Sequence, residues 1–157
     1  MADVLSTEER KKNMSRIRGK DTKPEIYIRK ILFSRGYRYR KNYSGIIGHP
    51  DIYLAKYRTA IFINGCFWHR HMNCRYAYMP KSRIEFWKKK FELNIARDQL
   101  VHEQLLEQGT KCLVIWECCI KKMRGNSEIE NKVIQMIDAF LISDDVYMEI
   151  PREEIEI

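Results

Sequence analysis

An apolar run and the loop that follows it constrain this chain more than any other feature. Residues 59–63 are apolar after Thr59, which is typical of a central strand in a sheet, and Gly65 ends the run. The next nine residues, 66–74, contain two cysteines, two histidines and two large aromatic residues. No other segment has such a density of metal-binding and proton-transferring side chains. The rest of the chain is therefore expected to form a frame that holds this loop.

The elements around the loop predict an α/β fold. Asp21 or Thr22 can cap a first helix, and Ser-x-x-Glu capping boxes at Ser82 and Ser127 predict the starts of two more. Glycines predict the ends of the first two helices, near residues 36 and 109. Four strands are expected, over residues 37–41, 51–54, 59–63 and 111–116. This order of elements predicts a mixed central β-sheet flanked by helices.

The chain is expected to fold as one domain, because 157 residues suit a single core. Within it we expect a basic arm at residues 1–20 and a core with the loop at residues 21–126. Residues 127–157 are expected to add a last helix and an acidic, weakly patterned tail to the same domain.

The positive charge is concentrated at the N-terminal end. Of the 29 Lys and Arg residues thirteen fall within residues 1–44, with only five of the 21 acidic residues. A basic segment is typical of a contact with a polyanion, first of all nucleic acid, although a solvated basic face is the alternative. A short helix is expected near Thr7, with Met14 and Ile17 as its only apolar pair. Such an arm either orders on a partner or frays.

The cysteines indicate a reducing compartment. Their number, five, is odd, and no secretory signal precedes them, so we expect a cytoplasmic protein without disulfides. No apolar run approaches the roughly 20 residues needed to span a membrane, so no membrane association is expected.

Three residues of the loop have the spacing of a zinc site. Cys66, His71 and Cys74 form a C-x4-H-x2-C pattern, and either Cys118 or Cys119 could be a fourth ligand. Structural Zn²⁺ sites take four such ligands in a tetrahedron, and a distant fourth ligand would pin the loop to the sheet. The alternative is that the thiols are buried as small apolar groups, which we prefer for Cys112.

If His71 binds metal, His69 is held nearby without coordinating. A neutral imidazole in that position suits a general base, although a lone histidine is more often structural. Asp51 and the Gly65 loop both stand at predicted strand ends, where α/β folds commonly place their ligand sites. Glu25 lies in the first turn of its helix, where the helix dipole alone would explain a carboxylate.

The chain resembles the very short patch repair (Vsr) DNA mismatch endonucleases over residues 1 to about 120. The resemblance rests on several motifs: Phe62-Ile63-Asn64-Gly65-Cys66-Phe67-Trp68-His69-Arg70-His71, Met79-Pro80-Lys81-Ser82, Glu85-Phe86-Trp87, Asn94-x-x-Arg97-Asp98, Trp116-Glu117-Cys118, Asn13-Met14 and Pro50-Asp51. It implies a restriction-endonuclease-like core that nicks double-stranded DNA on the 5′ side of the mispaired T in T:G mismatches. These mismatches arise by deamination of 5-methylcytosine, which implies functional pairing with a cytosine-5 DNA methyltransferase. We expect a monomer that works on the DNA of a prokaryotic nucleoid.

The resemblance also implies roles for individual residues. Asp51 and the backbone carbonyl of Ile63 would hold a catalytic Mg²⁺, and His69 would activate water, with Glu25 and Asp98 assisting. The structural Zn²⁺ would be held by Cys66, His71, Cys74 and Cys118. The residues expected to contact DNA are Phe67, Trp68 and Trp87 as wedges in the base stack, Met14 from the minor groove, and Lys89. For Trp87, packing in the core is an equal alternative, because it lies on the apolar stripe of its helix.

Two features depart from familiar patterns. The Glu-x-Lys of restriction-like nucleases is absent, since Phe62-Ile63-Asn64 stands in its place, which suits a histidine base. Some relatives carry a second histidine where this chain has Asn64. Two other functions compatible with these residues are a zinc-stabilised DNA-binding protein without catalysis and a related nuclease of different specificity.

Overall fold

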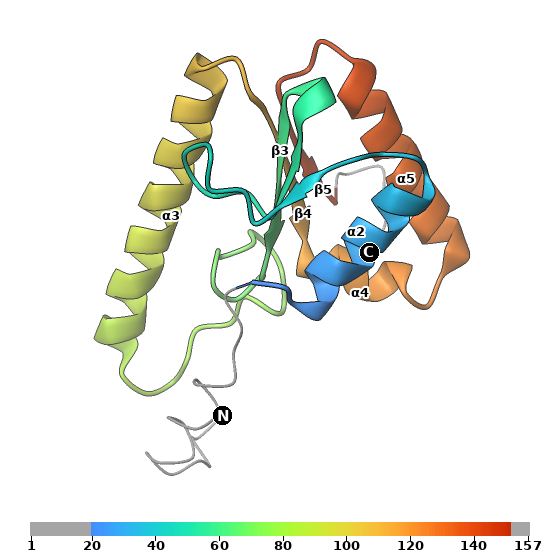
Figure 1. Ribbon diagram of the computed structural model, residues 1–157. Helices are drawn as coiled ribbons and strands as arrows, with labels where there is room; N and C mark the ends of the chain where they lie inside the picture. Colours follow the sequence, from blue (N-terminus) through green and yellow to red (C-terminus); the bar gives the residue numbers. More distant parts are fainter. Residues whose placement is uncertain (1–19, 152–157) are drawn as a thin grey trace.

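The computed structural model describes residues 20–151, which form a mixed α/β structure (Figure 1). The expected arm helix near Thr7, the arm residue Met14 and residues 152–157 of the tail lie outside the described residues. The elements, in chain order, are α2 (Lys23–Ser34), β1 (Arg40–Lys41), β2 (Ile52–Leu54), a short 3-10 helix η1 (Ala55–Tyr57), β3 (Thr59–Asn64), α3 (Ile84–Glu107), β4 (Lys111–Trp116), α4 (Glu117–Met123), α5 (Ser127–Ile142) and β5 (Tyr147–Ile150).

The five strands form one mixed sheet in the order β1-β2-β3-β4-β5, as the sequence predicted for its type. The pairs β1/β2 and β2/β3 are antiparallel, whereas β3/β4 and β4/β5 are parallel. The continuously apolar β3 is an inner strand, because it pairs with strands on both sides. Since β3 and β4 are parallel, the segments that follow Asn64 and Trp116 emerge at the same edge of the sheet.

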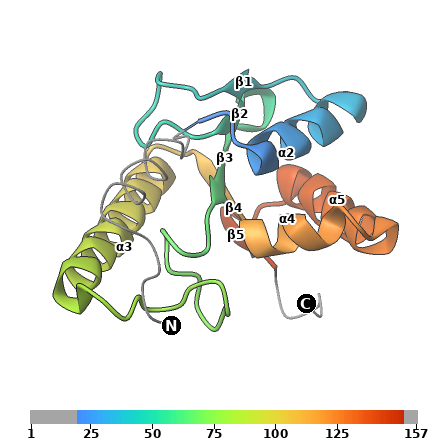
Figure 2. The ribbon, with the colours of Figure 1, turned by 90° about the horizontal axis from the view of Figure 1, so that it is seen from below.

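Helices cover both faces of the sheet. Of the α-helices that the structure describes, Figures 1 and 2 show α3 on one face of the sheet and α2, α4 and α5 on the other. The larger core lies under α2, α4 and α5 and includes Ile28, Leu32, Ile61, Ile115 and Ile137. A smaller cluster that includes Ala60, Leu105 and Cys112 packs under α3. No helix within residues 20–151 combines the length and the apolarity that crossing a membrane requires.

Helix starts were only partly predicted. Thr22 caps α2 as expected, since its side chain accepts a hydrogen bond from the Glu25 N–H, and Pro24 stands in the first turn. The capping box at Ser82 was wrong, because the N-cap of α3 is Arg83 in a left-handed conformation (φ 54°) without a side-chain cap. The box at Ser127 was wrong by one residue. Asn126 is the cap of α5, and its side chain accepts from the N–H groups of Glu128 and Ile129.

One predicted strand was too long, and helix α4 and strand β5 were not predicted. The strand expected over residues 37–41 is regular only at Arg40–Lys41. Helix α4 was not predicted. It follows β4 directly, and no glycine or proline stands between them to indicate the end of the strand. The tail, interpreted as weakly patterned, contains β5, in which Met148 and Ile150 are buried and alternate with exposed residues.

Candidate active site and metal centre

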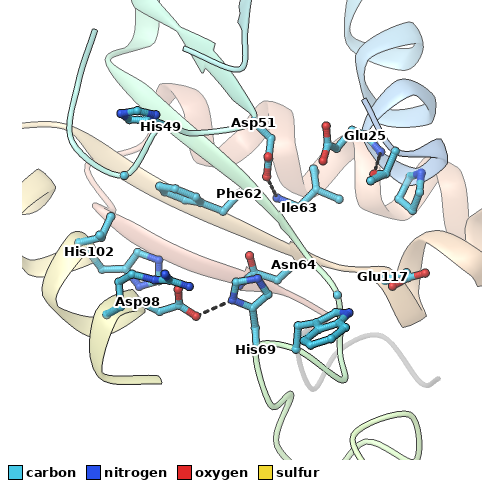
Figure 3. Close-up of a pocket in the computed structure, with 17 residues that line it drawn as sticks. Glu25, His49, Asp51, Phe62, Ile63, Asn64, His69, Asp98, His102 and Glu117 are labelled. Atoms are coloured by element: carbon cyan, nitrogen blue, oxygen red, sulfur yellow. Dashed lines mark hydrogen bonds and ion pairs between the residues drawn. The ribbon is translucent and has the colours of Figure 1, made fainter. Parts of the chain in front are cut away.

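A cavity of about 930 Å³ opens at the edge of the sheet where β3 and β4 end (Figure 3). It is lined by the start of α2, by Gly48, His49 and Asp51, by β3, by the loop after Gly65, by α3 and by Glu117 at the start of α4. The sequence-predicted residues Glu25, Asp51, Ile63, His69 and Asp98 all line it.

Asp51 stands just before β2 and points across β3. The backbone N–H of Ile63 donates to Asp51 Oδ2 at 2.7 Å, so the carboxylate and the end of β3 are held together. Burial raises the pKa of Asp51 to about 7, and the nearby charge of Glu25 adds to the rise. A half-buried carboxylate whose pKa is raised, at the end of a strand, is typical of a functional site that binds a cation or a proton.

Glu25 lies in the same part of the cavity as Asp51, although in the sequence its position in the first turn of the helix was explained by the helix dipole alone. Its side chain is buried, and its Oε2 accepts a hydrogen bond of 2.8 Å from the Asp21 N–H. Burial raises the pKa of Glu25. Figure 3 shows the carboxylates of Glu25 and Asp51 directed into the same space beside Ile63.

On the other side of β3, His69 pairs with Asp98. His69 Nδ1 lies 2.7 Å from Asp98 Oδ2, which joins the loop to the middle of α3. Asn94, one turn earlier on α3, donates through Nδ2 to the carbonyl of Trp68 at 3.0 Å. These contacts explain two polar residues on or beside the apolar stripe of the helix, because both side chains bind the loop.

Four side chains converge into a cluster able to hold a metal ion. The ligand atoms of Cys66, His71, Cys74 and Cys118 all lie within 4.8 Å of one another. His71 Nδ1 is 3.4 Å from Cys118 Sγ, and the His71 ring stacks on Trp116 with centroids 4.2 Å apart. The spacing in the sequence left open whether Cys118 or Cys119 is the fourth ligand. Both lie in the first turn of α4, where Cys118 belongs to the cluster and Cys119 packs in the larger core.

The aromatic residues of the loop pack against the start of α3. The Phe67 ring centroid lies 5.2 Å from that of Trp68, 5.5 Å from that of Trp87 and 5.2 Å from that of Phe91. Phe91 is buried, whereas Phe67, Trp68 and Trp87 are partly exposed. Trp87 therefore both packs in this group and reaches the surface. Lys89, on the same turns of the helix, is exposed.

Sequence reasoning gave no role to several residues at the site. His49, Asn64, His102 and Glu117 line the cavity. Arg70 binds the loop to itself by donating to the carbonyls of Phe67, Ala77 and Tyr78, and it lies over the Phe91 ring at 3.8 Å. The sequence signals that could have drawn attention to them were the position of Glu117 directly after β4 and that of Arg70 between His69 and His71.

The fold and the cavity define an α/β enzyme that brings carboxylates, a His–Asp pair and a separate Cys/His cluster to one edge of its sheet. Comparisons with known proteins identify the family. The profile of DNA mismatch endonuclease Vsr matches residues 2–75. DNA mismatch endonuclease Vsr of Escherichia coli strain K12 is 35% identical over 134 residues, which is 85% of this chain and 83% of that protein.

Two further relatives are type II nicking enzymes. V.NmeAIP of Neisseria meningitidis serogroup A is 42% identical over 137 residues, 87% of this chain and 97% of the relative. V.XorIIP of Xanthomonas oryzae pv. oryzae is 42% identical over 118 residues, 75% of this chain and 86% of the relative. The chain belongs to the Vsr DNA mismatch endonuclease family, and it is a DNA endonuclease with a restriction-endonuclease-like fold.

Proposed function

We propose that this protein uses Mg²⁺ to nick one strand of duplex DNA on the 5′ side of the mispaired T in a T:G mismatch. The observation that carries the proposal is the placement of Asp51 and Glu25 opposite the His69–Asp98 pair in one cavity. The relatives named as nicking enzymes and as a mismatch endonuclease support the choice of substrate and of a single-strand cut.

The carboxylate side of the cavity fits a hard divalent cation. Glu25 is buried and Asp51 is half-buried in the same cavity, and two such carboxylates are stabilised in their charged forms by a cation between or beside them. Asp51 and the carbonyl of Ile63 would hold Mg²⁺, with Glu25 behind them. When bound, the ion stabilises negative charge on the scissile phosphate and the leaving oxygen.

His69 would supply the base. With its Nδ1–H donated to Asp98, the ring presents an unprotonated Nε2, which can take a proton from water as the oxygen attacks phosphorus and the P–O3′ bond breaks. Asp98 keeps the ring in the required tautomer and stabilises the imidazolium that forms. The absence of a lysine after Phe62-Ile63 is consistent with this assignment, because the imidazole takes over the task of activating water.

The four-residue cluster fits Zn²⁺ as a structural ion. Three thiols and one imidazole are a soft, closed donor set of the kind found in structural zinc sites. Cys66, His71 and Cys74 would anchor the loop, and Cys118 would tie it to α4. The ion would thereby fix His69, which lies between two of the ligands in sequence.

Mismatch recognition would fall to the aromatic group. Insertion of Phe67, Trp68 and Trp87 between base pairs costs a few kcal/mol of unstacking, and this cost is least at a mismatch. Met14 would enter from the minor groove, and Lys89 would contact a phosphate. The substrate would arise wherever a cytosine-5 DNA methyltransferase has marked a cytosine that then deaminates.

The decisive experiment incubates the protein with end-labelled duplexes that differ only in a T:G or C:G pair, with and without Mg²⁺. We expect a single nick 5′ of the mispaired T that requires Mg²⁺ and is absent from the C:G duplex. An Asp51→Asn variant should bind the T:G duplex yet leave it uncut. No cutting of T:G at any Mg²⁺ concentration would refute the proposal, and equal cutting of both duplexes would indicate a nuclease of other specificity.

A further inference from the structure

Exposed basic side chains gather at the free edge of the sheet, on and beside β1. Arg38, Arg40 and Lys41 are all exposed, and within the part of the chain that the structure describes β1 pairs with β2 alone. Within residues 20–151 no ion pair joins any of the three to a carboxylate, whereas Arg35 nearby pairs with Asp138 at 2.7 Å. We refer to Arg38, Arg40 and Lys41 as the basic edge.

Both guanidinium groups of the basic edge rest on aromatic rings. Arg38 lies over the Phe33 ring at 4.3 Å. Arg40 lies over the Tyr43 ring at 5.2 Å and donates to the Tyr43 hydroxyl at 3.3 Å. Stacking of this kind restricts the side chains and lowers the entropy that they lose on binding a ligand.

The Tyr43 ring, over which Arg40 lies, is itself held in place by its neighbours. The Tyr43 ring stacks on Tyr53 with centroids 5.0 Å apart and planes only 10° from parallel. Gly45 leaves the space for this arrangement, because a Cβ there would lie 2.2 Å from Tyr43 Cζ. The local sequence therefore holds the Arg40 charge in place at the edge of the sheet.

The basic edge is directly connected to the catalytic cavity. Lys41 pairs with Ile52, the residue after Asp51, and the Asn42 N–H donates to the Asp51 carbonyl at 2.9 Å. Figure 2 shows β1 on one side of β3 and the loop at residues 65–83 on the other. A duplex that places its scissile phosphate in the cavity and its mismatch against the aromatic loop would thus extend toward β1.

We propose that the basic edge binds backbone phosphates of duplex DNA on the side of the cut away from the aromatic loop. The proposal rests on the proposed cleavage of DNA in the adjacent cavity. Arg and Lys contacts to phosphates release condensed counterions and position the protein without reading the bases. The basic edge would therefore add affinity to any duplex equally, and the aromatic loop would add the preference for a mismatch.

The test measures the dissociation constant for T:G and C:G duplexes at several salt concentrations, without divalent cations so that no cutting occurs. We expect Arg40→Gln and Lys41→Gln each to reduce the slope of log affinity against log salt by about 0.9 on both duplexes. In the double variant this slope should be reduced by about 1.8, with the ratio of T:G to C:G affinity unchanged. Arg40→Lys, which keeps the charge, should retain the slope.

Lys132→Gln is the matched control, because Lys132 is an exposed lysine on α5 that pairs with Glu128 at 3.7 Å. Its salt slope should equal that of the unmodified protein. Melting curves would verify that each variant folds. Unchanged slopes for folded Arg40→Gln and Lys41→Gln would overturn the proposal, as would a loss of the T:G preference without a change of slope. A protein that shows the expected slopes but does not prefer or nick T:G would refute the proposed function and leave the basic edge established.

Discussion

His69 Nδ1 lies 2.7 Å from Asp98 Oδ2, so a loop residue and a helix residue 29 positions apart form one unit at the cavity. Since a carboxylate accepts from an N–H, the contact favours the tautomer of the neutral ring in which Nδ1 carries the proton. It also orients the ring from α3, an element separate from the loop. A histidine held in this way differs from a solvated surface histidine in both tautomer and direction.

This relationship predicts the effect of changing Asp98. In Asp98→Asn the amide can donate to Nδ1 and stabilise the tautomer whose Nε2 carries the proton, which cannot act as a base. We expect the nicking rate to fall about 10²- to 10⁴-fold, the range that general-base catalysis contributes, with little change in DNA affinity. Single-turnover nicking of a T:G duplex measures the rate, and a gel-shift titration measures the affinity. A His69→Gln variant should show the same loss, and a double variant should lose no more than either single one.

The Cys/His cluster predicts different outcomes for two adjacent cysteines. Cys118→Ser removes a donor of the cluster, whereas Cys119→Ser changes a fully buried residue of the larger core. Elemental analysis should find one zinc per chain in the unmodified protein and in Cys119→Ser, and much less in Cys118→Ser. Equal zinc content in the two variants would exclude Cys118 as a ligand.

Removal of the metal should loosen the same loop. A ligand that binds only the folded state stabilises it by about 4 kcal/mol at a thousand times its dissociation constant. For a chain of this size the loss corresponds to a decrease in melting temperature of about 10 °C. Thermal melting before and after treatment with a zinc-specific chelator tests this expectation, and restoring the melting temperature with Zn²⁺ but not Mg²⁺ is the control. An unchanged melting curve after complete metal removal would contradict it.

The fold could be predicted where the signal was local. The apolar run of β3 and the glycine after it identified an inner strand, and Thr22 with Pro24 identified the start of α2. β5 was missed because its alternation is short and lies within an acidic tail, so only its pairing with β4 makes it a strand. The left-handed Arg83 at the N-cap of α3 could not be predicted, because a residue other than glycine rarely adopts a positive φ.

The site, like the fold, could be predicted from the sequence only where the signal was local. Residue types and spacing indicated His69 as a general base and Cys66, His71 and Cys74 as metal ligands, and the strand-end position drew attention to Asp51. The metal-binding role of Asp51 and the choice of Cys118 came from the resemblance to the Vsr family. Contacts between distant segments could not be predicted from the sequence. The pairing of His69 with Asp98, the hydrogen bond from Ile63 to Asp51 and the burial of Glu25 all depend on how the elements pack. Glu25 in particular had an adequate local explanation in the helix dipole, so in the sequence only the resemblance gave it a further role, and its burial beside Asp51 could not be foreseen.

The aromatic group predicts a selective loss of mismatch recognition. Trp68 packs against Phe67 and Trp87 at the surface, and stacking of one base on an aromatic side chain contributes about 1–3 kcal/mol. Trp68→Ala should therefore weaken binding to a T:G duplex about 5- to 150-fold and binding to a C:G duplex much less. Fluorescence titration with labelled duplexes measures both affinities. Trp68→Phe, which keeps a ring, should retain most of the preference, and an equal loss on both duplexes would contradict a wedge.

Stability at alkaline pH should depend on Tyr37. Tyr37 donates its hydroxyl hydrogen to Asp138 Oδ1, and burial, together with this bond and the Asp138 charge, raises the pKa of Tyr37 above its usual value of 10.0. Because the folded state holds this proton more tightly than the unfolded state, the contribution is fully present below about pH 10 and is lost as the pH rises toward the folded-state pKa. Urea unfolding between pH 8 and 11 should show a steeper fall in the free energy of unfolding for the unmodified protein than for Tyr37→Phe. Since other groups titrate in both proteins, the difference between the two curves isolates Tyr37, and parallel curves would contradict the prediction.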